Sequence, residues 1–313
     1  MQSASSFQVD ISPPKIDGFA DGTAGIPYIH LLDSGRPGPT AMISAVVHGN
    51  ELCGAIVAAE LLSSGFHPAC GRLFVAFMNV AAFKSFDPDH PDQSRYQDED
   101  FNRVWDTDRL DGPATTREVR RAQEVRPIVE QVDYLLDLHS TSSFSPPMML
   151  SGLDSRAVEF ARALGTDHAI ICDAGHKAGR RMRDFDRFRP ETGAGISLLV
   201  ECGQHWQTGT VTVARDVTDR FLRLLDMRDG PTPTANPDQT VLTVTDAVTV
   251  MHSGLRFVES FNGLECIPKK GTPIALDGPN TIETPYDNCY LVMPTRHALP
   301  GQTAVRFARK AGI

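Results

Sequence analysis

Short apolar, β-branched runs alternate with longer amphipathic segments along most of this chain. The runs have the length of buried strands, and the segments between them have the spacing of helices that bury one face. This alternation is typical of α/β proteins, in which helices cover a central sheet. We predict a mixed, mostly parallel sheet with helices on both faces. The expected strands lie at 40–47, 72–79, 134–139, 147–152, 168–174 and 195–203, and the expected helices at about 51–63, 114–130, 155–164 and 208–227.

The character of the sequence changes after Met227. Residues 228–240, RDGPTPTANPDQT, are rich in Pro, Gly and polar side chains, as linkers often are. Beyond them, VLTVTDAVTVMHSGLRFVES alternates apolar and polar residues, which indicates strands. We therefore predict a larger α/β domain over residues 1–235 and a small all-β domain over residues 236–313.

Composition and charge exclude several classes of protein. Hydrophobic residues make up 41% and charged residues 22% of the 313 residues, and no apolar run approaches the roughly 20 residues of a membrane helix. The first residues lack the basic flank and apolar core of a signal peptide, so we expect a cytoplasmic protein. A formal net charge of −9 disfavours nucleic acid as a partner.

The cysteines and one basic segment give weaker signals. The absence of a C-x-x-C pair argues against a thiolate zinc site and a dense disulfide framework, so we expect reduced, buried thiols. The six cysteines are Cys53, Cys70, Cys172, Cys202, Cys266 and Cys289. The arginine-rich segment 176–189 is by default a solvated basic loop; the alternative is a rim that attracts an anionic substrate.

The most informative local sequence is HGNE, residues 48–51, which follows the first predicted strand. His48 and Glu51 stand in a turn before a helix, and their spacing can bring both side chains to one side as metal ligands. A helix N-terminus also favours Glu for its dipole alone. The pair by itself does not decide between these interpretations.

His139 is the candidate for a third ligand. It ends the apolar run VDYLLDLHS at the carboxyl edge of a predicted central strand, where ligands gather in open α/β sheets. Asp137, on the same strand face, is suited to accept a hydrogen bond from an imidazole. Two imidazoles and one carboxylate are a common ligand set for catalytic zinc. The alternative is a core histidine bonded to backbone.

Two further segments carry charged side chains that a zinc hydrolase would need. Glu201 ends the apolar run GISLLVECG and is a candidate general base, although an ordinary exposed acid at a strand end is an equally good interpretation. Arginines of a predicted loop could bind carboxylates bidentately, whereas the default interpretation is a solvated charged loop. This loop, SRYQDEDFNRVW at 94–105, contains Arg95, Asp100, Asn102 and Arg103.

Together, the motifs HGNE, RYQDEDFNR, DLHST and VECG resemble, in order and spacing, the succinylglutamate desuccinylase and aspartoacylase family. This family is a branch of the zinc carboxypeptidase-like hydrolases. The motifs span roughly residues 40–205, and the β-rich tail is similar to the family's C-terminal domain. The resemblance implies a zinc carboxypeptidase-like fold and makes residues 1–235 the catalytic domain.

The resemblance also implies a metal site and a general base. One zinc per chain would be held by His48, Glu51 and His139. Glu201 would activate water for attack on an amide carbonyl and then protonate the departing amine. The implied reaction is hydrolysis of a small N-acyl amino acid, which would be the protein's partner molecule.

The loop residues receive substrate-binding roles by the same resemblance. Arg95 would polarise the scissile carbonyl and stabilise the oxyanion, for which a fixed cation in a dry site is well suited. Asn102 and Arg103 would grip a substrate carboxylate, and Asp100 would orient the loop.

The sequence departs from the family pattern just before Glu201. Aspartoacylases use a Tyr and an Arg there to recognise the aspartyl carboxylate, and DRFRPETGAGISLLVE lacks the tyrosine. Arg187 and Arg189 are the nearby candidates for substrate binding. The acyl group, the amino acid and homo-oligomerisation therefore stay open. The alternatives are a zinc carboxypeptidase acting on short peptides and a catalytically silent zinc-binding relative.

Overall fold

The structure, a computed structural model, describes residues 8–295 and 298–311. The α-helices of the described chain are α1 (Leu52–Ser63), α2 (Val80–Lys84), α3 (Thr107–Leu110), α4 (Arg117–Val129), α5 (Ser155–Ala163) and α6 (Thr208–Leu224). Its strands are β1 (Ile29–Asp33), β2 (Thr40–Ala45), β3 (Arg72–Phe77), β4 (Tyr134–Thr141), β5 (Met148–Leu150), β6 (Ala169–Cys172), β7 (Ile196–Gln204), β8 (Val241–Thr249), β9 (Arg256–Phe257), β10 (Glu265–Ile267), β11 (Pro273–Asp277), β12 (Asn280–Glu283), β13 (Cys289–Val292) and β14 (Thr303–Lys310).

The elements predicted before residue 228 form where the sequence places them. The predicted strands correspond to β2 through β7, and the predicted helices to α1, α4, α5 and α6. β1, α2 and α3 were not predicted, because their short sequences show no clear strand or helix pattern. β1 is a half-buried edge strand of five residues whose neighbour in the described sheet is β3.

One large sheet of 11 strands has the order β1-β3-β2-β4-β7-β5-β6-β8-β14-β13-β10. β3, β2, β4 and β7 are parallel neighbours, as are β5, β6 and β8. β1 is antiparallel to β3, and β5 is antiparallel to β7. The prediction of a mixed sheet is confirmed, whereas "mostly parallel" holds only for the central strands. β5 reverses because the segment 142–147 is shorter than the dozen or so residues that a parallel crossover needs.

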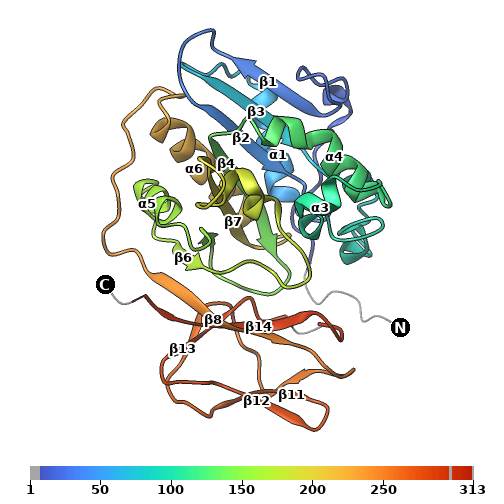
Figure 1. Cartoon of the computed structure of the whole chain (residues 1–313), viewed down its shortest axis with the longest axis vertical. Helices are drawn as coiled ribbons and strands as arrows, with labels where there is room; N and C mark the ends of the chain where they lie inside the picture. Colours follow the sequence, from blue (N-terminus) through green and yellow to red (C-terminus); the bar gives the residue numbers. More distant parts are fainter. Residues whose placement is uncertain (1–7, 296–297, 312–313) are drawn as a thin grey trace.

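The region after α6 contains only strands among the described residues, but these strands do not form a separate sheet. β8 pairs in parallel with β6, and β14, β13 and β10 continue the large sheet from β8. β12, β11 and β9 form a second, three-stranded sheet. In Figure 1 the C-terminal strands lie beyond the carboxyl ends of β4 and β7. The predicted β content is confirmed, and the division at residue 235 stays a prediction.

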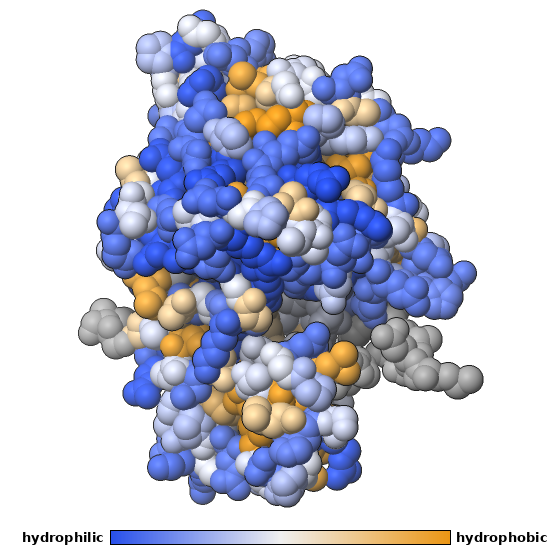
Figure 2. Space-filling model, turned by 45° about the vertical axis from the view of Figure 1, so that its right-hand side comes forward, coloured by the Kyte–Doolittle hydropathy of each residue, from blue (hydrophilic) through white to orange (hydrophobic). Residues whose placement is uncertain are grey.

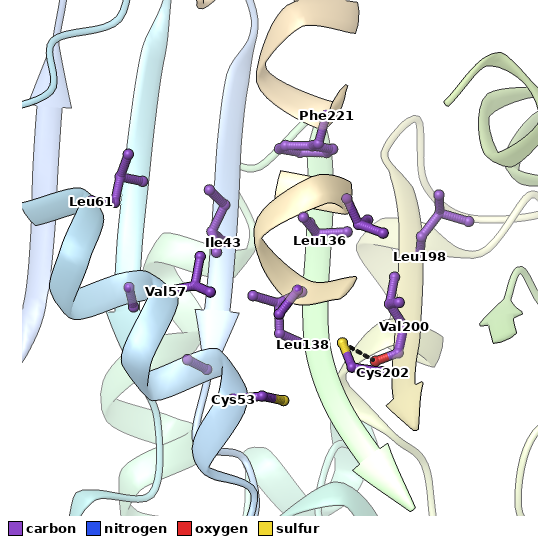
Figure 3. Close-up of a cluster of buried hydrophobic side chains, with 14 of the residues drawn as sticks. Ile43, Cys53, Val57, Leu61, Leu136, Leu138, Leu198, Val200, Cys202 and Phe221 are labelled. Atoms are coloured by element: carbon purple, nitrogen blue, oxygen red, sulfur yellow. Dashed lines mark hydrogen bonds between the residues drawn. The ribbon is translucent and has the colours of Figure 1, made fainter. Parts of the chain in front are cut away.

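Helices cover both faces of the central sheet, as expected. α1 and α6 pack on one face, where apolar side chains of β2, β4 and β7 meet Val57 and Leu61 of α1 and Phe221 of α6 (Figure 3). α4 covers the other face through Val119, Ala122 and Val125. A fully buried Val, Leu or Phe side chain contributes about 1.5–3 kcal/mol to stability. The two helix layers therefore stabilise the central sheet and hold the ends of its strands in place.

The cysteines are free thiols, and the face shown in Figure 2 is mostly hydrophilic. All six cysteines are free thiols. The expectation that all are buried is wrong for Cys266, which is exposed on the short strand β10. Cys70 is half-buried. The face of the molecule in Figure 2 is mostly hydrophilic, with small apolar patches. Among the described residues, no helix combines the length and apolar character needed to cross a membrane.

Candidate active site

The carboxyl ends of three neighbouring strands bring the predicted metal and base residues together. His48 follows β2, His139 lies near the end of β4, and Glu201 lies in β7. β2 pairs with β4 and β4 with β7, and the register places His139 directly beside Glu201. The three side chains therefore share one edge of the sheet, although they are far apart in the sequence.

The turn between β2 and α1 has a tightly constrained backbone. Val46 adopts a φ of 62°, a left-handed conformation that is strained for a β-branched residue. A Cβ on Gly49 would lie 2.3 Å from the backbone carbonyl oxygen of Ser94, so only glycine fits there. The Gly49 N–H also donates to the carbonyl oxygen of Arg95 at 3.0 Å. This turn fixes His48 and at the same time anchors the loop that carries Arg95.

Glu51 stands at the N-cap of α1 without capping the helix. Its carboxylate instead bridges the two histidines: Oε1 lies 2.7 Å from Nδ1 of His48, and Oε2 lies 2.8 Å from Nδ1 of His139. The ligand atoms of the three residues all lie within 4.8 Å of one another, and all three side chains are buried. This geometry favours a metal site over the interpretation of Glu51 as a dipole-stabilising residue.

An aspartate supports each imidazole from its outer side. Nε2 of His139 lies 3.0 Å from Asp137, and Nε2 of His48 lies 2.9 Å from Asp100. Such carboxylates orient ligand imidazoles and raise their basicity. The expectation that Asp137 bonds to an imidazole is confirmed. Both ring nitrogens of His139 face carboxylates, those of Asp137 and Glu51, so His139 is not a core histidine bonded to backbone.

The charges in this site shift the pKa values of its members. Burial opposes ionisation of Glu51, but His48 and His139 outweigh it and hold the pKa of Glu51 well below its ordinary value. Burial disfavours the protonated form of His139, yet Asp137 and Glu51 raise its pKa well above the ordinary value. The protein thus favours a carboxylate at Glu51, which a cation needs.

Glu201 is buried with only 8% of its surface exposed, so it is not an ordinary solvated acid at a strand end. Its Oε2 has no hydrogen-bond partner among the described residues. Burial and the nearby charge of Glu51 raise the pKa of Glu201 to about 8, although His139 and Arg95 oppose this shift. A carboxyl group whose pKa lies near neutrality suits a residue that accepts and releases a proton.

Arg95 reaches the cluster of His48, Glu51 and His139 from the loop. Its Nη1 lies 3.5 Å from Oε1 of Glu51, and its Nη2 donates to Asp100 at 3.1 Å. Glu118 of α4 holds the loop in place. Its fully buried carboxylate accepts hydrogen bonds from the backbone N–H groups of Gln97, Asp98 and Glu99.

Asn102 and Arg103 lie in a short 3-10 turn of the same loop (Phe101–Arg103). Asn102 is buried, and its Oδ1 accepts a hydrogen bond from the N–H of Met182 at 2.8 Å. Arg103 Nη2 lies 3.9 Å from Asp100. Burial and the neighbouring arginines lower the pKa of Arg103 to about 10, although Asp100 opposes this. The interpretation as a solvated charged loop is therefore wrong, because Asn102 is buried and the loop backbone bonds to the fully buried Glu118.

The structure does not bring Arg187 and Arg189 into this site. Arg187 donates to the carbonyl oxygen of Val132 and to Asp133, just before β4 begins. His139 lies roughly 20 Å farther along the strand at the usual rise per residue. Arg189 pairs with Asp186 and with Glu191 on the surface. Both arginines therefore contact residues away from His48, Glu51 and His139.

Comparison with known proteins adds the family. Residues 37–225 match the succinylglutamate desuccinylase/aspartoacylase catalytic domain. The chain belongs to this family. The match covers the turn with His48 and Glu51, the Arg95 loop, and the strands with His139 and Glu201. No curated relative matches the sequence.

Solved structures of low sequence identity share the fold of this family member. A succinylglutamate desuccinylase from Vibrio parahaemolyticus has 18% identity and a TM-score of 0.64, covering 89% of this chain and 83% of that chain. The ectoine utilization protein EutE from Ruegeria pomeroyi has 17% identity and a TM-score of 0.64, with 90% and 88% covered. Murine aminoacylase 3 has 17% identity and a TM-score of 0.62, with 88% and 96% covered. A coverage of 88–90% of this chain extends the structural likeness beyond the residues of the family match.

Several residues near the site of this family member carry no clear sequence signal. Within the arginine-rich segment, Arg181 and Arg183 are buried, which overturns the default of a solvated loop. Arg181 forms ion pairs with Asp173 and Asp184. Glu118 and Arg306 come from α4 and β14, whose sequences look like ordinary structural segments. Only the unusual density of arginines in 176–189 could have drawn attention to this side of the site.

Proposed function

We propose that this protein is a zinc-dependent hydrolase that cleaves the amide bond of a small N-acyl amino acid. The observation that carries the proposal is the buried triad of His48, Glu51 and His139 beside the buried carboxyl group of Glu201. Membership of the desuccinylase/aspartoacylase family supports an N-acyl amino acid as the substrate. The arginines of the loop give the site the positive charge that an acylated amino acid requires.

The donor set of the triad fits zinc. Two imidazole nitrogens and one carboxylate oxygen, each oriented by a hydrogen-bonded neighbour, are typical of catalytic zinc sites that keep a position open. When bound, zinc would lower the pKa of water and polarise a carbonyl group. His48, Glu51 and His139 would hold the ion, and one ion per chain would be expected.

Glu201 is proposed as the general base and acid. Its carboxylate takes a proton from the attacking water as the oxygen adds to the amide carbonyl, and it then delivers that proton to the nitrogen of the departing amine. The raised pKa of about 8 makes both transfers accessible near neutral pH. The unpartnered Oε2 is free to receive the proton.

Arg95 and the Asn102–Arg103 pair are proposed to position the substrate. Arg95 lies between Glu51 and Asp100, where its guanidinium can face the oxyanion that develops on the amide carbonyl. Asn102 and Arg103 would bind a carboxylate of the substrate, while Oδ1 of Asn102 holds the turn against Met182. Arg187 and Arg189 receive no role in this proposal, because their contacts lie elsewhere.

Metal analysis together with an assay of amine release tests the proposal. We expect about one zinc per chain and chelator-sensitive hydrolysis of N-acetyl or N-succinyl amino acids, with blocked dipeptides as the comparison. His48→Ala should lose both zinc and activity, whereas His90→Ala, a change of an exposed histidine, should keep both. Zinc without turnover of any N-acyl amino acid would contradict the proposed reaction, and hydrolysis of dipeptides alone would favour the carboxypeptidase alternative.

A further inference from the structure

The short connection between β7 and α6 contacts the two other strand ends that carry the candidate metal ligands. β7 ends at Gln204 and α6 begins at Thr208, so the connection consists of His205, Trp206 and Gln207. Both aromatic side chains of this connection are buried, with 1% of their surface exposed. Buried polar atoms in native proteins are nearly always hydrogen-bonded. The partners of His205 and Trp206 lie on segments that are distant in the sequence.

Trp206 reaches the turn that leads into α1. Its indole Nε1–H donates to the carbonyl oxygen of Asn50 at 3.1 Å. Asn50 directly precedes Glu51, the N-cap residue of α1 whose carboxylate bridges the two histidines. The Trp206 ring also belongs to the same apolar cluster as the first turn of α1. The indole therefore fixes the backbone immediately before the bridging carboxylate.

His205 reaches the end of β4. Its Nδ1 lies 2.8 Å from Oγ of Ser140, and its backbone N–H donates to the carbonyl oxygen of Thr141 at 2.9 Å. Ser140 directly follows His139, and its own N–H donates to Oε2 of Glu51 at 3.2 Å. The same carboxylate oxygen lies 2.8 Å from Nδ1 of His139. A continuous hydrogen-bonded path thus runs from His205 through Ser140 to Glu51.

An irregularity at the end of β7 places these two side chains. The register of β4 against β7 shifts between His139 and Thr141, where β7 contains one extra residue. Gly203, within this irregularity, has a φ of 113°, which side-chain-bearing residues rarely adopt. Its carbonyl oxygen accepts a hydrogen bond from Thr141 Oγ1 at 3.1 Å. The rings of His205 and Trp206 then pack against each other, with centroids 5.3 Å apart.

We propose that His205 and Trp206 form a clamp that fixes the spacing of the metal ligands and thereby raises the affinity of the site for zinc. Trp206 holds Glu51 through the backbone of Asn50. His205 holds the same carboxylate through Ser140. Both act through other residues, so they are positioning residues. The inference rests on the proposed function, because it takes zinc as the ion of the site, but it concerns metal binding rather than amide hydrolysis.

The two tryptophans of the chain provide a matched pair of variants. Trp105 is also buried, but its Nε1 has no hydrogen-bond partner among the described residues. Trp206→Phe removes the N–H that holds Asn50, whereas Trp105→Phe removes the same ring volume without that bond. Competition with a chromophoric chelator measures the dissociation constant of zinc. We expect Trp206→Phe to raise it about tenfold, as for other residues behind metal ligands, and Trp105→Phe to change it less than about twofold.

Variants of His205 test the second arm of the clamp. His205→Leu removes the bond to Ser140 and should raise the dissociation constant of zinc about tenfold. His205→Asn should stay within about threefold of wild type, because its side-chain amide places a polar atom close to the position of Nδ1. Ser140→Ala removes the same bond from the other side. The double variant His205→Leu/Ser140→Ala should therefore bind zinc no more weakly than the weaker of the two single variants.

Thermal unfolding with chelator present separates this role from a purely structural one. Both tryptophan replacements remove buried ring volume, so both should lower the thermal midpoint of the metal-free protein. Only Trp206→Phe should also weaken zinc binding. Cobalt in place of zinc adds a spectroscopic readout, because the visible absorption of Co²⁺ depends on the geometry of its ligands. This spectrum should change in Trp206→Phe and His205→Leu but not in Trp105→Phe.

Three outcomes would overturn the inference. These are unchanged zinc affinity in both Trp206→Phe and His205→Leu, an equal loss of affinity in Trp105→Phe, or additive losses from His205→Leu and Ser140→Ala. If Trp206→Phe does not fold, the His205 and Ser140 variants still give the answer. Wild-type protein that binds zinc but hydrolyses no N-acyl amino acid would contradict the proposed reaction and leave the clamp intact. Wild-type protein that binds no zinc would contradict both.

Discussion

The two ends of the candidate site differ in how completely their charges are neutralised. At the metal end, Glu51 bridges two imidazoles, and each imidazole has an aspartate behind it. At the other end, Oε2 of Glu201 has no hydrogen-bond partner among the described residues, and Arg103 and Arg306 lack close carboxylates. The first end is held rigidly before any ligand arrives, whereas the second leaves its polar groups for a ligand to satisfy.

This difference indicates where changes should affect structure and where they should affect only turnover. Residues of the metal end are tied to each other and to the turn of β2, so their replacement should alter metal content and folding. Residues of the other end have few internal bonds to lose, so their replacement should alter rates and selectivity. Four variants, ordered by the size of the expected effect, test this contrast.

Glu201→Gln should have the largest effect. The amide keeps the size of the side chain but accepts no proton, so kcat should fall about 10³-fold or more, equivalent to about 4 kcal/mol, while zinc content stays at one per chain. Turnover under saturating substrate and metal analysis of the same preparation measure both quantities. Turnover within tenfold of wild type would remove Glu201 from the mechanism.

His205 should make stability depend on pH. It lies behind the metal end, with Nδ1 2.8 Å from Ser140 Oγ, and burial lowers its pKa to about 4, although Glu51 opposes this. In the unfolded chain the pKa is about 6.5. Between these values only the unfolded chain binds the proton, so the free energy of unfolding falls as pH drops from about 6.5 to 4, by up to about 3 kcal/mol.

Urea unfolding at several pH values, with chelator present throughout, measures this dependence. His205→Asn should flatten the curve in that window relative to wild type. An unchanged slope in the variant would show that His205 does not cause the dependence. The exposed residue His90 provides the control, because His90→Asn removes a histidine without a buried environment.

Glu118→Gln should have an intermediate effect. The carboxylate accepts from three backbone N–H groups of the Arg95 loop and from Nδ2 of Asn79, and an amide has one acceptor oxygen and turns its NH₂ toward donors. We expect a loss of about 2 kcal/mol in unfolding free energy, typical of hydrogen bonds to a charged group, and about a tenfold fall in kcat/KM. Glu124→Gln, an exposed change on the same helix, should alter neither.

Arg187→Met should have the smallest effect. Arg187 pairs with the half-exposed Asp133 near the opposite end of β4, and such surface pairs contribute about 0–1 kcal/mol. We expect kcat/KM within twofold of wild type and a small change in the thermal midpoint. A large, substrate-dependent loss of kcat/KM would return Arg187 to the substrate site that the sequence suggested.

The central sheet and the cluster of His48, Glu51 and His139 could be predicted from the sequence because their signals are local. The apolar runs that form β2, β4 and β7 are continuous, and each ends in a polar residue at the same edge. His48, Glu51 and His139 therefore follow from strand ends and ligand chemistry. The Arg95 loop follows from its density of charged residues, although its buried contacts do not.

The parts that could not be predicted depend on contacts between distant segments. Whether β8 joins β6 is set by pairing that no short window of sequence contains. Arg306 reads as a polar residue in an alternating strand, and only the fold places its uncompensated charge near Glu201. Arg187 shows the opposite error, because closeness to Glu201 in the sequence does not bring it close in space.

The pairing of β6 with β8 has a consequence for how this chain holds together. A protein cut at the predicted boundary would present the backbone N–H and C=O groups of β6 as an open edge, which favours association with other chains. The residues before and after the cut are therefore expected to unfold in one transition rather than as two independent units. Because the same sheet joins the strands of His48 and His139 to β14, the C-terminal strands cannot swing away as a rigid unit without breaking the pairing of β6 with β8.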